Sequence, residues 1–553
     1  MLDVHRPLAG LAALALLAAW AGAAADPAGN PDADAKPWPS DAELETQGAR
    51  IGSVTIRIRP IFDPEVPGEN KALYRLADRL HIDTRASTIE AQLLFQPGDS
   101  YSRRVLDETE RNLRDLRFIN EPEIRVVGYH DGLVDLEVVT HEVWTTNPGI
   151  SFGRTGGKNS TGLQLEEINL FGFGKQLSFD YKEEVDRNLY ELKWRDPNIG
   201  GSRWRSALNL IDSDDGEGQI LVLERPFFSL DSRWSAGLSL VLDDAIQSVY
   251  RLGHPVAEYR QEVQNFDVRF GWSQGLRNGW TRRWTAGLRH EESQFSTAPG
   301  GPALAPLPRD RRLSYPFLRL NRIQDDFETA RNLDQIERTE DQHFGTRYAL
   351  ELGWAATVYG SDRNAALLRA EASHGFRFDD GQSLFLAGGL ASRVEDGSAR
   401  DALLSGSLRY YRRTSPRRVL FASLTGELGH ELDADHELTL GGDNGLRGYP
   451  LRYQTGSSRA FLTIEQRYYT GRTLWRVVDI GAAVFFDMGQ TWGESAFGPT
   501  GGLGLLKDIG VGLRLGINRS ALGNVIHLDV AFPLDGDRSI SDVQFLVQTK
   551  RSF

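Results

Sequence analysis

An arginine set between glycines is the residue of this chain best suited to a specific polar interaction. Arg447 lies in the segment Gly441-Gly442-Asp443-Asn444-Gly445-Leu446-Arg447-Gly448-Tyr449-Pro450, whose composition is typical of a loop. The neighbouring glycines allow a close approach to another backbone, and a guanidinium can bind a carboxylate through two parallel hydrogen bonds. This chemistry fastens segments together and does not catalyse a reaction. The alternative is a glycine-rich turn with a solvated arginine.

Two acidic residues follow the arginine at positions suited to pair with it. Glu465 lies in Phe461-Leu462-Thr463-Ile464-Glu465-Gln466-Arg467-Tyr468, and Asp487 lies in Val484-Phe485-Phe486-Asp487-Met488-Gly489. Each run is rich in residues that favour strands, and in each an acid interrupts the apolar pattern. Both acids could therefore point into an enclosed interior, where Arg447 would find them.

Signals for other site chemistry are weak. Gly172-Phe173-Gly174-Lys175 lacks the spacing of a phosphate-binding loop, so a turn between strands is the simpler interpretation. The 11 histidines show no metal-binding spacing, and His141 and His374 fall within strand patterns. The absence of cysteine excludes thiolate metal sites and cysteine nucleophiles. No residues suggest a Ser/His/Asp triad. We expect neither enzymatic activity nor a cofactor.

The N-terminal segment indicates export from the cytoplasm. Residues 1–25 combine His5 and Arg6, a Leu/Ala-rich run and small residues before Asp26, as in a secretory signal peptide. The alternative is a membrane anchor, for which the run is short. Residues 26–50 contain four prolines and are expected to form a flexible leader. The net charge of -13 argues against a nucleic-acid partner.

The mean hydropathy of -0.38 argues against a helical membrane protein. It does not argue against a transmembrane barrel, whose strands of about ten residues alternate apolar and polar side chains. At 553 residues, more than one domain is expected.

Residues 51–143 predict a small α+β domain. Val54, Ile56 and Ile58 alternate with polar residues as in a half-buried strand. Two helices follow, the first with Leu73, Leu76, Ala77 and Leu80 and the second with Ser102 as N-cap and Leu106, Thr109, Leu113 and Leu116 on one face. Two strands joined by an Asp131-Gly132 turn complete the order strand, helix, helix, strand, strand.

Residues 144–553 predict a long succession of strands that alternate apolar and polar residues, as in an antiparallel transmembrane β-barrel. In the last strand, one face is expected to carry Val543, Phe545, Val547 and the terminal Phe553. The polar inserts 299–312 and 321–345 are expected to be outer loops. A soluble β-sandwich is the alternative, but closure into a barrel removes sheet edges more simply.

Residues 51–143 resemble one POTRA domain, the periplasmic module of outer-membrane assembly and secretion barrels; an unrelated α+β domain is the alternative. The strand segments resemble the barrel of the BamA/TamA superfamily, of the bacterial surface antigen type. The segments that carry this resemblance are residues 162–175, 196–204, 446–449, 485–489, 510–514 and 528–534.

This resemblance implies a mainly β fold with a barrel of about 16 strands, whose sixth extracellular loop folds into the lumen. It implies that Arg447, followed by Gly448 and Tyr449, pairs there with Glu465 and Asp487. Members that run the essential assembly machinery usually carry several POTRA domains and two-partner exporters carry two, whereas this chain has room for one.

The function expected from this resemblance is insertion or translocation of other proteins at the outer membrane of a Gram-negative cell, with the POTRA-like domain in the periplasm. The expected partners are the outer-membrane bilayer, unfolded or secreted client proteins, and periplasmic or outer-membrane accessory proteins. A dedicated exporter of one partner protein and a passive porin-like channel are the alternatives.

Overall fold

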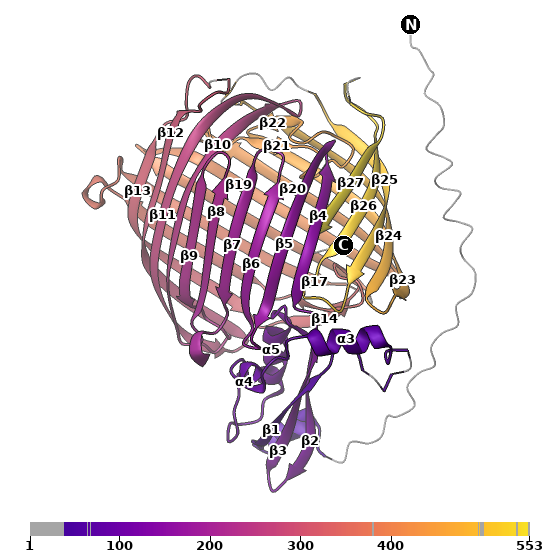
Figure 1. Cartoon of the computed structure of the whole chain (residues 1–553). Helices are drawn as coiled ribbons and strands as arrows, with labels where there is room; N and C mark the ends of the chain where they lie inside the picture. The colour runs from indigo at the N-terminus through magenta and orange to yellow at the C-terminus, as the bar shows by residue number, and fades with distance from the viewer. Residues whose placement is uncertain are drawn as a thin grey trace.

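The computed structural model describes residues 38–63, 65–66, 68–302, 304–378, 381–495, 497, 503–521, 523–537 and 540–550. The expected signal peptide (1–25), residues 26–37 of the expected leader and the terminal Phe553 lie outside the described residues. The described chain forms a small α+β domain below one end of a large β-barrel (Figure 1). We name this end of the barrel the domain end and the opposite end the loop end.

The α+β domain is built on a three-stranded sheet in the order β1-β3-β2, with β1 parallel and β2 antiparallel to β3. Leu106 and Leu113 of α5 pack with Ile89 of α4 in the same apolar core as Leu136 and Val138 of β3. The domain's elements are α2 (Asp41–Thr46), β1 (Arg50–Arg59), α3 (Ala72–Leu80), α4 (Ala86–Glu90), α5 (Arg103–Arg114), β2 (Ile119–His130) and β3 (Leu133–Glu142).

Two sequence-based expectations for this region were wrong. The leader does not extend to residue 50, because α2 precedes β1 and its Leu44 is fully buried in the domain core. Among the described residues three helices, not two, lie between β1 and β2. The first of them, α3, packs against the barrel: its Tyr74 stacks on Phe62 and donates a hydrogen bond of 3.0 Å to the backbone oxygen of Trp475 in a barrel turn. The short α4, which the sequence did not predict, contributes Ile89 to the domain core.

The barrel is a closed antiparallel ring of 20 strands among the described residues. Side chains that face the interior alternate with side chains that face outward along the strands. In β24 the buried positions include Asp479, Ala483, Phe485 and Asp487, and the residues between them are partly exposed. The strands are β4 (Thr146–Thr155), β5 (Lys158–Leu170), β6 (Lys175–Glu183), β7 (Asn188–Asp196), β8 (Arg205–Ser213), β9 (Glu217–Arg225), β10 (Trp234–Arg251), β11 (His254–Arg277), β12 (Trp280–Thr297), β13 (Arg311–Gln324), β16 (Arg347–Ala355), β17 (Ala365–Arg377), β18 (Gln382–Glu395), β19 (Ser398–Ser415), β20 (Arg418–His430), β23 (Ser458–Leu474), β24 (Val478–Trp492), β25 (Leu506–Ile517), β26 (Val525–Pro533) and β27 (Gln544–Lys550).

The expectation of about 16 strands was therefore wrong, since the described strands form a ring of 20. Counting the connections at the loop end from β4 onward, the segment with Arg447 joins β20 to β23 and is the eighth such loop, not the sixth. Alternation marks strands locally, but the number that closes a ring depends on tilt and register around the whole sheet.

The expectation that the polar insert 321–345 is an outer loop was also wrong. It begins inside β13 and continues as the hairpin of β14 (Phe327–Arg331) and β15 (Thr339–His343). Because β13 runs toward the domain end, this hairpin lies beside the α+β domain and not among the outer loops (Figure 1).

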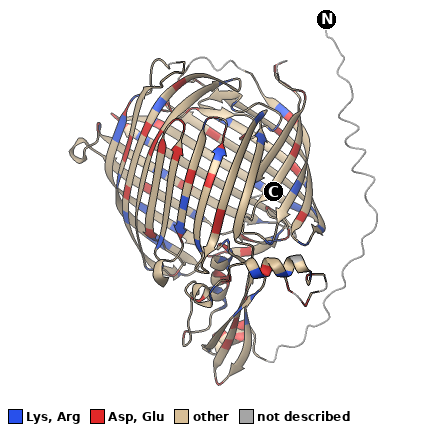
Figure 2. Cartoon of the chain, viewed as in Figure 1, with Lys and Arg blue, Asp and Glu red and all other residues tan. Residues whose placement is uncertain are grey.

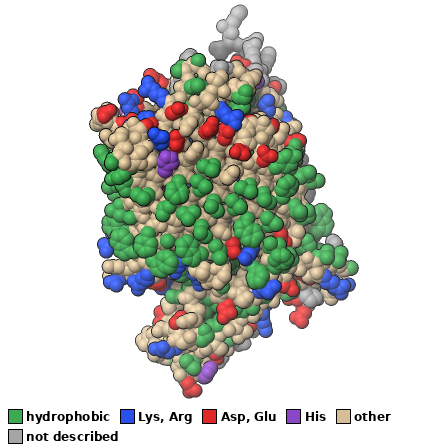
Figure 3. All heavy atoms as spheres, turned by 60° about the vertical axis from the view of Figure 1, so that its left-hand side comes forward, with side chains coloured by type: hydrophobic (Ala, Val, Ile, Leu, Met, Phe, Trp, Pro, Cys, Tyr) green, Lys and Arg blue, Asp and Glu red, His purple; other side chains and the backbone are tan. Residues whose placement is uncertain are grey.

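The outer surface of the barrel carries an apolar band. Figure 3 shows hydrophobic side chains across the middle of the face in view, with charged side chains mainly above and below them. Figure 2 shows acidic and basic residues along many of the barrel strands. Several of these acids are buried, among them Asp180, Asp267 and Glu351. Exposed outward-facing residues include Phe179, Leu192, Phe270, Trp272, Leu288, Leu352, Leu404 and Phe545. No helix among the described residues is long and apolar enough to span a membrane.

Candidate functional site

The loop between β20 and β23 folds back into the barrel and forms the candidate site. Its two short strands, β21 (Leu438–Leu440) and β22 (Gln454–Gly456), pair with each other, and Arg447 lies in the segment between them. Leu446 and Tyr449 are fully buried and pack with Leu506 of β25. The loop therefore has an apolar core of its own that fixes where the arginine stands.

Side-chain and backbone chemistry shape the turn before Arg447. Asn444 accepts a hydrogen bond from the backbone N–H of Gly441 at 2.8 Å and donates one to the backbone oxygen of Thr439 at 2.8 Å. Gly448 lies so close to the wall that an added Cβ would be 2.6 Å from Cβ of Asp508. Only glycine allows that approach.

Arg447 is bound by two acids on neighbouring strands. Its Nε and Nη2 donate to the two carboxylate oxygens of Asp487 at 2.6 and 2.9 Å, and its Nη1 donates to Glu465 at 2.7 Å. The guanidinium carbon lies 3.4 Å from the ring centroid of Phe485, which covers one face of the cation. The structure thus brings together the three charged residues that the sequence singled out.

A wider ion network surrounds this pair. Arg467 donates to Glu465 at 3.1 Å, and Arg514 lies between Glu465, at 3.8 Å, and Asp529, to which it is hydrogen-bonded. Asp529 is also 3.8 Å from Arg447. We name Arg447, Glu465, Arg467, Asp487, Asp508, Arg514 and Asp529 the lumenal cluster. All seven are buried, so the ion pairs among them are shielded from water.

The residues that follow Arg447 attach the loop to β25 and its flanks. The backbone N–H of Gly448 donates to Asp508 at 3.0 Å, and the hydroxyl of Tyr449 donates to the backbone oxygens of Lys507 and Asp535 at 2.8 and 3.2 Å. Gly448 and Tyr449 therefore hold the loop by separate contacts in addition to the arginine.

Sequence reasoning did not single out Asp508, Arg514 or Asp529. The alternation of the two strands could have revealed them. Asp508 and Arg514 lie on the same face of β25, and Asp529 lies on the same face of β26 as His527. Charged residues at the inward-facing positions of two neighbouring strands predict an ion network in the barrel interior, as Glu465 and Asp487 did.

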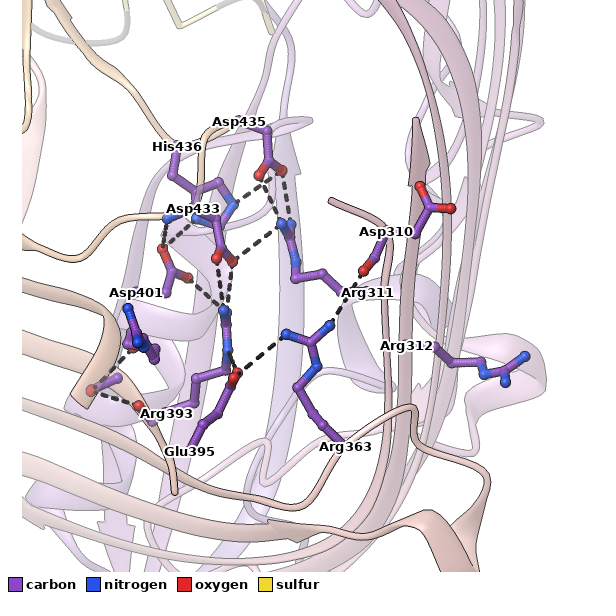
Figure 4. A network of polar contacts seen from close by, with 12 residues as sticks. Asp310, Arg311, Arg312, Arg363, Arg393, Glu395, Asp401, Asp433, Asp435 and His436 are labelled. Carbon is purple, nitrogen blue, oxygen red and sulfur yellow. Dashed lines mark hydrogen bonds and ion pairs between the residues drawn. The ribbon is translucent and has the colours of Figure 1, made fainter. Parts of the chain in front are cut away.

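A second ion network holds the first part of the loop to other strands (Figure 4). Asp433 binds Arg393 of β18 through two hydrogen bonds of 2.7 Å, and Asp435 binds Arg311 of β13 at 2.7 and 2.8 Å. His436 lies 2.8 Å from Asp401. The strand β13 is seven junctions from β24, so the loop is anchored at well-separated positions of the ring.

Asp401, Asp433 and His436 also lie close enough together to ligate a cation. However, the guanidinium of Arg393 is already 2.7 Å from Asp433 and 3.6 Å from Asp401. A fixed positive charge there neutralises the acids and disfavours a metal ion.

The attachment of this first part of the loop should weaken as the pH rises. The hydrogen bond to Asp401 holds the pKa of His436 above its usual value of 6.5, while burial opposes this. A raised histidine pKa stabilises the contact below the ordinary pKa, and that contribution is lost as the pH rises through the folded-state pKa. Hydrogen exchange of residues 431–437 should therefore be slower at about pH 6 than at about pH 9, after correction for intrinsic rates. The variant His436→Gln should lose this dependence, and an unchanged dependence in the variant would contradict the assignment.

The junction between β27 and β4 is the weakest in the ring. Among the described residues it has one paired position, Val547 with Arg154, whereas every other junction has at least seven. Gly153, Gly156 and Gly157 lie in or directly after β4, and glycine packs poorly in strands. We name this junction the seam.

The loop contacts the first hairpins of the barrel, beside the seam. A Cβ on Gly156, which has a φ of 54°, would collide with the backbone of Leu451, and one on Gly442 would lie 2.9 Å from Cα of Gly156. Arg452 pairs with Asp186 in the turn after β6 at 2.6 and 3.0 Å. The loop therefore bridges the lumenal cluster and the strand that forms one side of the seam.

The C-terminal residues are placed on β27 as follows. Phe545 is exposed on the outer surface, and Val547 occupies the seam position opposite Arg154. Val543 directly precedes the strand. Gln544 and Leu546 are the buried, inward-facing positions.

Comparison with known proteins gives distant structural likenesses. No protein-family model and no curated protein matches the chain. CdiB from Escherichia coli matches with 13% identity and a TM-score of 0.47, covering 91% of this chain and 76% of that one. BamA from Haemophilus ducreyi lacking POTRA domains 1-3 matches with 14% identity and a TM-score of 0.39, covering 91% and 85%. The FrpB iron transporter from Neisseria meningitidis matches with 9% identity and a TM-score of 0.39, covering 93% and 87%. At these scores the likenesses assign no function.

Proposed function

We propose that this chain is an outer-membrane protein of the BamA/TamA superfamily that inserts or translocates client proteins. In this proposal, residues 1–25 are a signal peptide, the apolar band lies in the bilayer, and the α+β domain is a periplasmic POTRA-like module. The domain end of the barrel then faces the periplasm and the loop end faces outward.

The observation that carries the proposal is the seam. A barrel strand normally has its backbone groups satisfied by two neighbours, whereas β27 and β4 share one paired position among the described residues. Backbone groups left without a strand partner are a template on which an extended client segment gains hydrogen bonds. A barrel that opens at the seam could therefore pass a new strand into the bilayer.

The lumenal cluster supports the same function. Opening a seam weakens the ring, and the loop holds this part of the wall together through buried ion pairs to β23 and β24 and a backbone hydrogen bond to β25. A protein that only conducts solutes has no need of a weak junction. The interior is moreover crossed by the loop between β20 and β23, which disfavours the passive porin-like alternative.

The outer-membrane proteome of cells with and without this protein tests the function. We expect the abundance of at least one other outer-membrane or surface protein to fall when the chain is absent, and to recover with the wild type but not with Arg447→Ala. Inner-membrane proteins serve as the control. Loss of a single secreted protein from the cell surface would favour a dedicated exporter, and an unchanged proteome would contradict the proposal.

A further inference from the structure

The hairpin β14–β15, residues 327–343, is an insertion at the domain end whose tip lies inside the barrel. Its tip residues Leu333 and Ile336 are buried among inward-facing side chains of several strands. These side chains are Phe385 of β18, Tyr411 of β19, Val419 and Phe421 of β20, Tyr469 of β23, Ala483 of β24 and Val525 of β26.

The hairpin reaches across the barrel. It starts between β13 and β16, yet a Cβ on Gly516 of β25 would lie 3.1 Å from Cβ of Ile336. In the ring, β25 is seven junctions from β16 and eight from β13, out of 20. The tip therefore meets a wall nearly opposite its own origin, so the hairpin spans the mouth of the barrel at the domain end.

The barrel wall holds the tip through specific polar contacts. The hydroxyl of Tyr411 donates to the carboxylate of Asp334 at 2.9 Å, and that of Tyr469 donates to the backbone oxygen of Leu333 at 3.0 Å. Arg467 donates to Asp334 at 3.2 Å and to Glu465 at 3.1 Å. Since Glu465 also binds Arg447, one arginine joins the hairpin to the lumenal cluster.

The tip is also built to keep its shape. The carboxylate of Glu340 accepts hydrogen bonds from the backbone N–H groups of Leu333, Asp334 and Gln335, at distances from 2.9 to 3.2 Å. A carboxylate that accepts consecutive N–H groups fixes a turn without help from neighbouring strands. The hairpin can therefore move as one rigid piece.

The other side of the hairpin is held by the α+β domain. Arg114 of α5 binds Asp341 through two hydrogen bonds of 2.7 Å. Glu121 of β2 accepts the backbone N–H of Thr339 at 2.9 Å and a guanidinium N–H of Arg331 at 2.8 Å. The hairpin is thus a layer between the domain and the barrel interior.

Glu121 occupies an irregular position of an edge strand. The pairing of β2 with β3 shifts register between Asn120 and Glu123, and Glu121 has a φ of 43°, a conformation that costs free energy for a residue other than glycine. The contacts with Thr339 and Arg331 therefore hold Glu121 in this conformation.

We propose that residues 327–343 form a plug that the α+β domain holds in the barrel mouth, and that loss of the domain's contacts with the hairpin releases it. Release would also withdraw Asp334 from Arg467, so a change at the domain would be transmitted to the lumenal cluster.

Ion conductance of the purified full-length chain in planar lipid bilayers tests the plug without any client. The variant Arg114→Ala/Glu121→Ala removes the two charged side chains through which the domain binds the hairpin. We expect the open probability of its channel to rise about tenfold or more over that of the wild type. Arg125→Ala is the matched control, because Arg125 pairs with Glu137 within the domain, and it should behave as the wild type.

A reversible cross-link keeps the test independent of variant folding. The chain has no cysteine, so Ile336→Cys/Gly516→Cys introduces the only two thiols, at positions close enough for a disulfide. Oxidation should suppress openings when this pair is added to Arg114→Ala/Glu121→Ala, and reduction should restore them. Equal conductance in the wild type, the released variant and the oxidised variant would overturn the plug. An outer-membrane proteome that does not depend on the protein would overturn the proposed function and leave this conductance result standing.

Discussion

Arg447→Ala should detach the loop from the wall and destabilise the barrel by about 3 kcal/mol, because it leaves Asp487 fully buried without its cation. Asp487→Ala should cost a similar amount. Glu465→Ala should leave Arg447 its bidentate contact with Asp487 and therefore cost less. Stability is measured as the urea concentration at the midpoint of unfolding, monitored by the gel mobility of unheated and boiled samples. The effect in cells is measured as the abundance of client proteins.

The double variant Arg447→Ala/Asp487→Ala separates a direct contact from two independent effects. It should be no less stable than the worse single variant, because both substitutions remove the same interaction. Arg452→Ala provides the control in the same loop: its partner Asp186 is partly exposed, so the loss should stay within about 1 kcal/mol. Strictly additive losses for Arg447 and Asp487 would show that their contact does not hold the loop.

Closing the seam covalently should abolish function while leaving the barrel folded. Arg154→Cys and Val547→Cys place one thiol on each side of the seam, at the one position where the described strands pair. When oxidised, this variant should lower client abundance to that of cells lacking the protein, and reduction should restore it. The gel mobility of the unheated protein should not change, because the ring itself remains intact.

A second cysteine pair controls for the effect of a cross-link as such. Phe179→Cys and Leu192→Cys join β6 and β7, which pair along eight positions and have no reason to separate. Oxidation of this pair should leave client levels as in the wild type. Normal client levels with the seam cross-linked would reject passage between β27 and β4 and favour export through the interior.

Alternation along single strands was enough to predict part of the site. A period of two places every second side chain on the same face, so an acid at the parity of buried Phe485 must face the interior, as Asp487 does. The glycines beside Arg447 similarly indicated a close approach to another segment, and Gly448 lies against Asp508. The same argument applied to β25 places Asp508 toward the interior as well, since it alternates with exposed Ile509.

Periodicity and glycine chemistry act over a few residues, so they were enough to predict a strand-rich chain with a small α+β domain before it, and an arginine with two inward-facing acids. They did not predict the docking of α3 on a barrel turn or the direction of the hairpin 327–343, nor, among the described residues, the ring of 20 strands and the seam with one paired position. Each of these depends on closing the ring. Closure brings together residues far apart in sequence, such as Ile336 and Gly516, whose contact has no local signature.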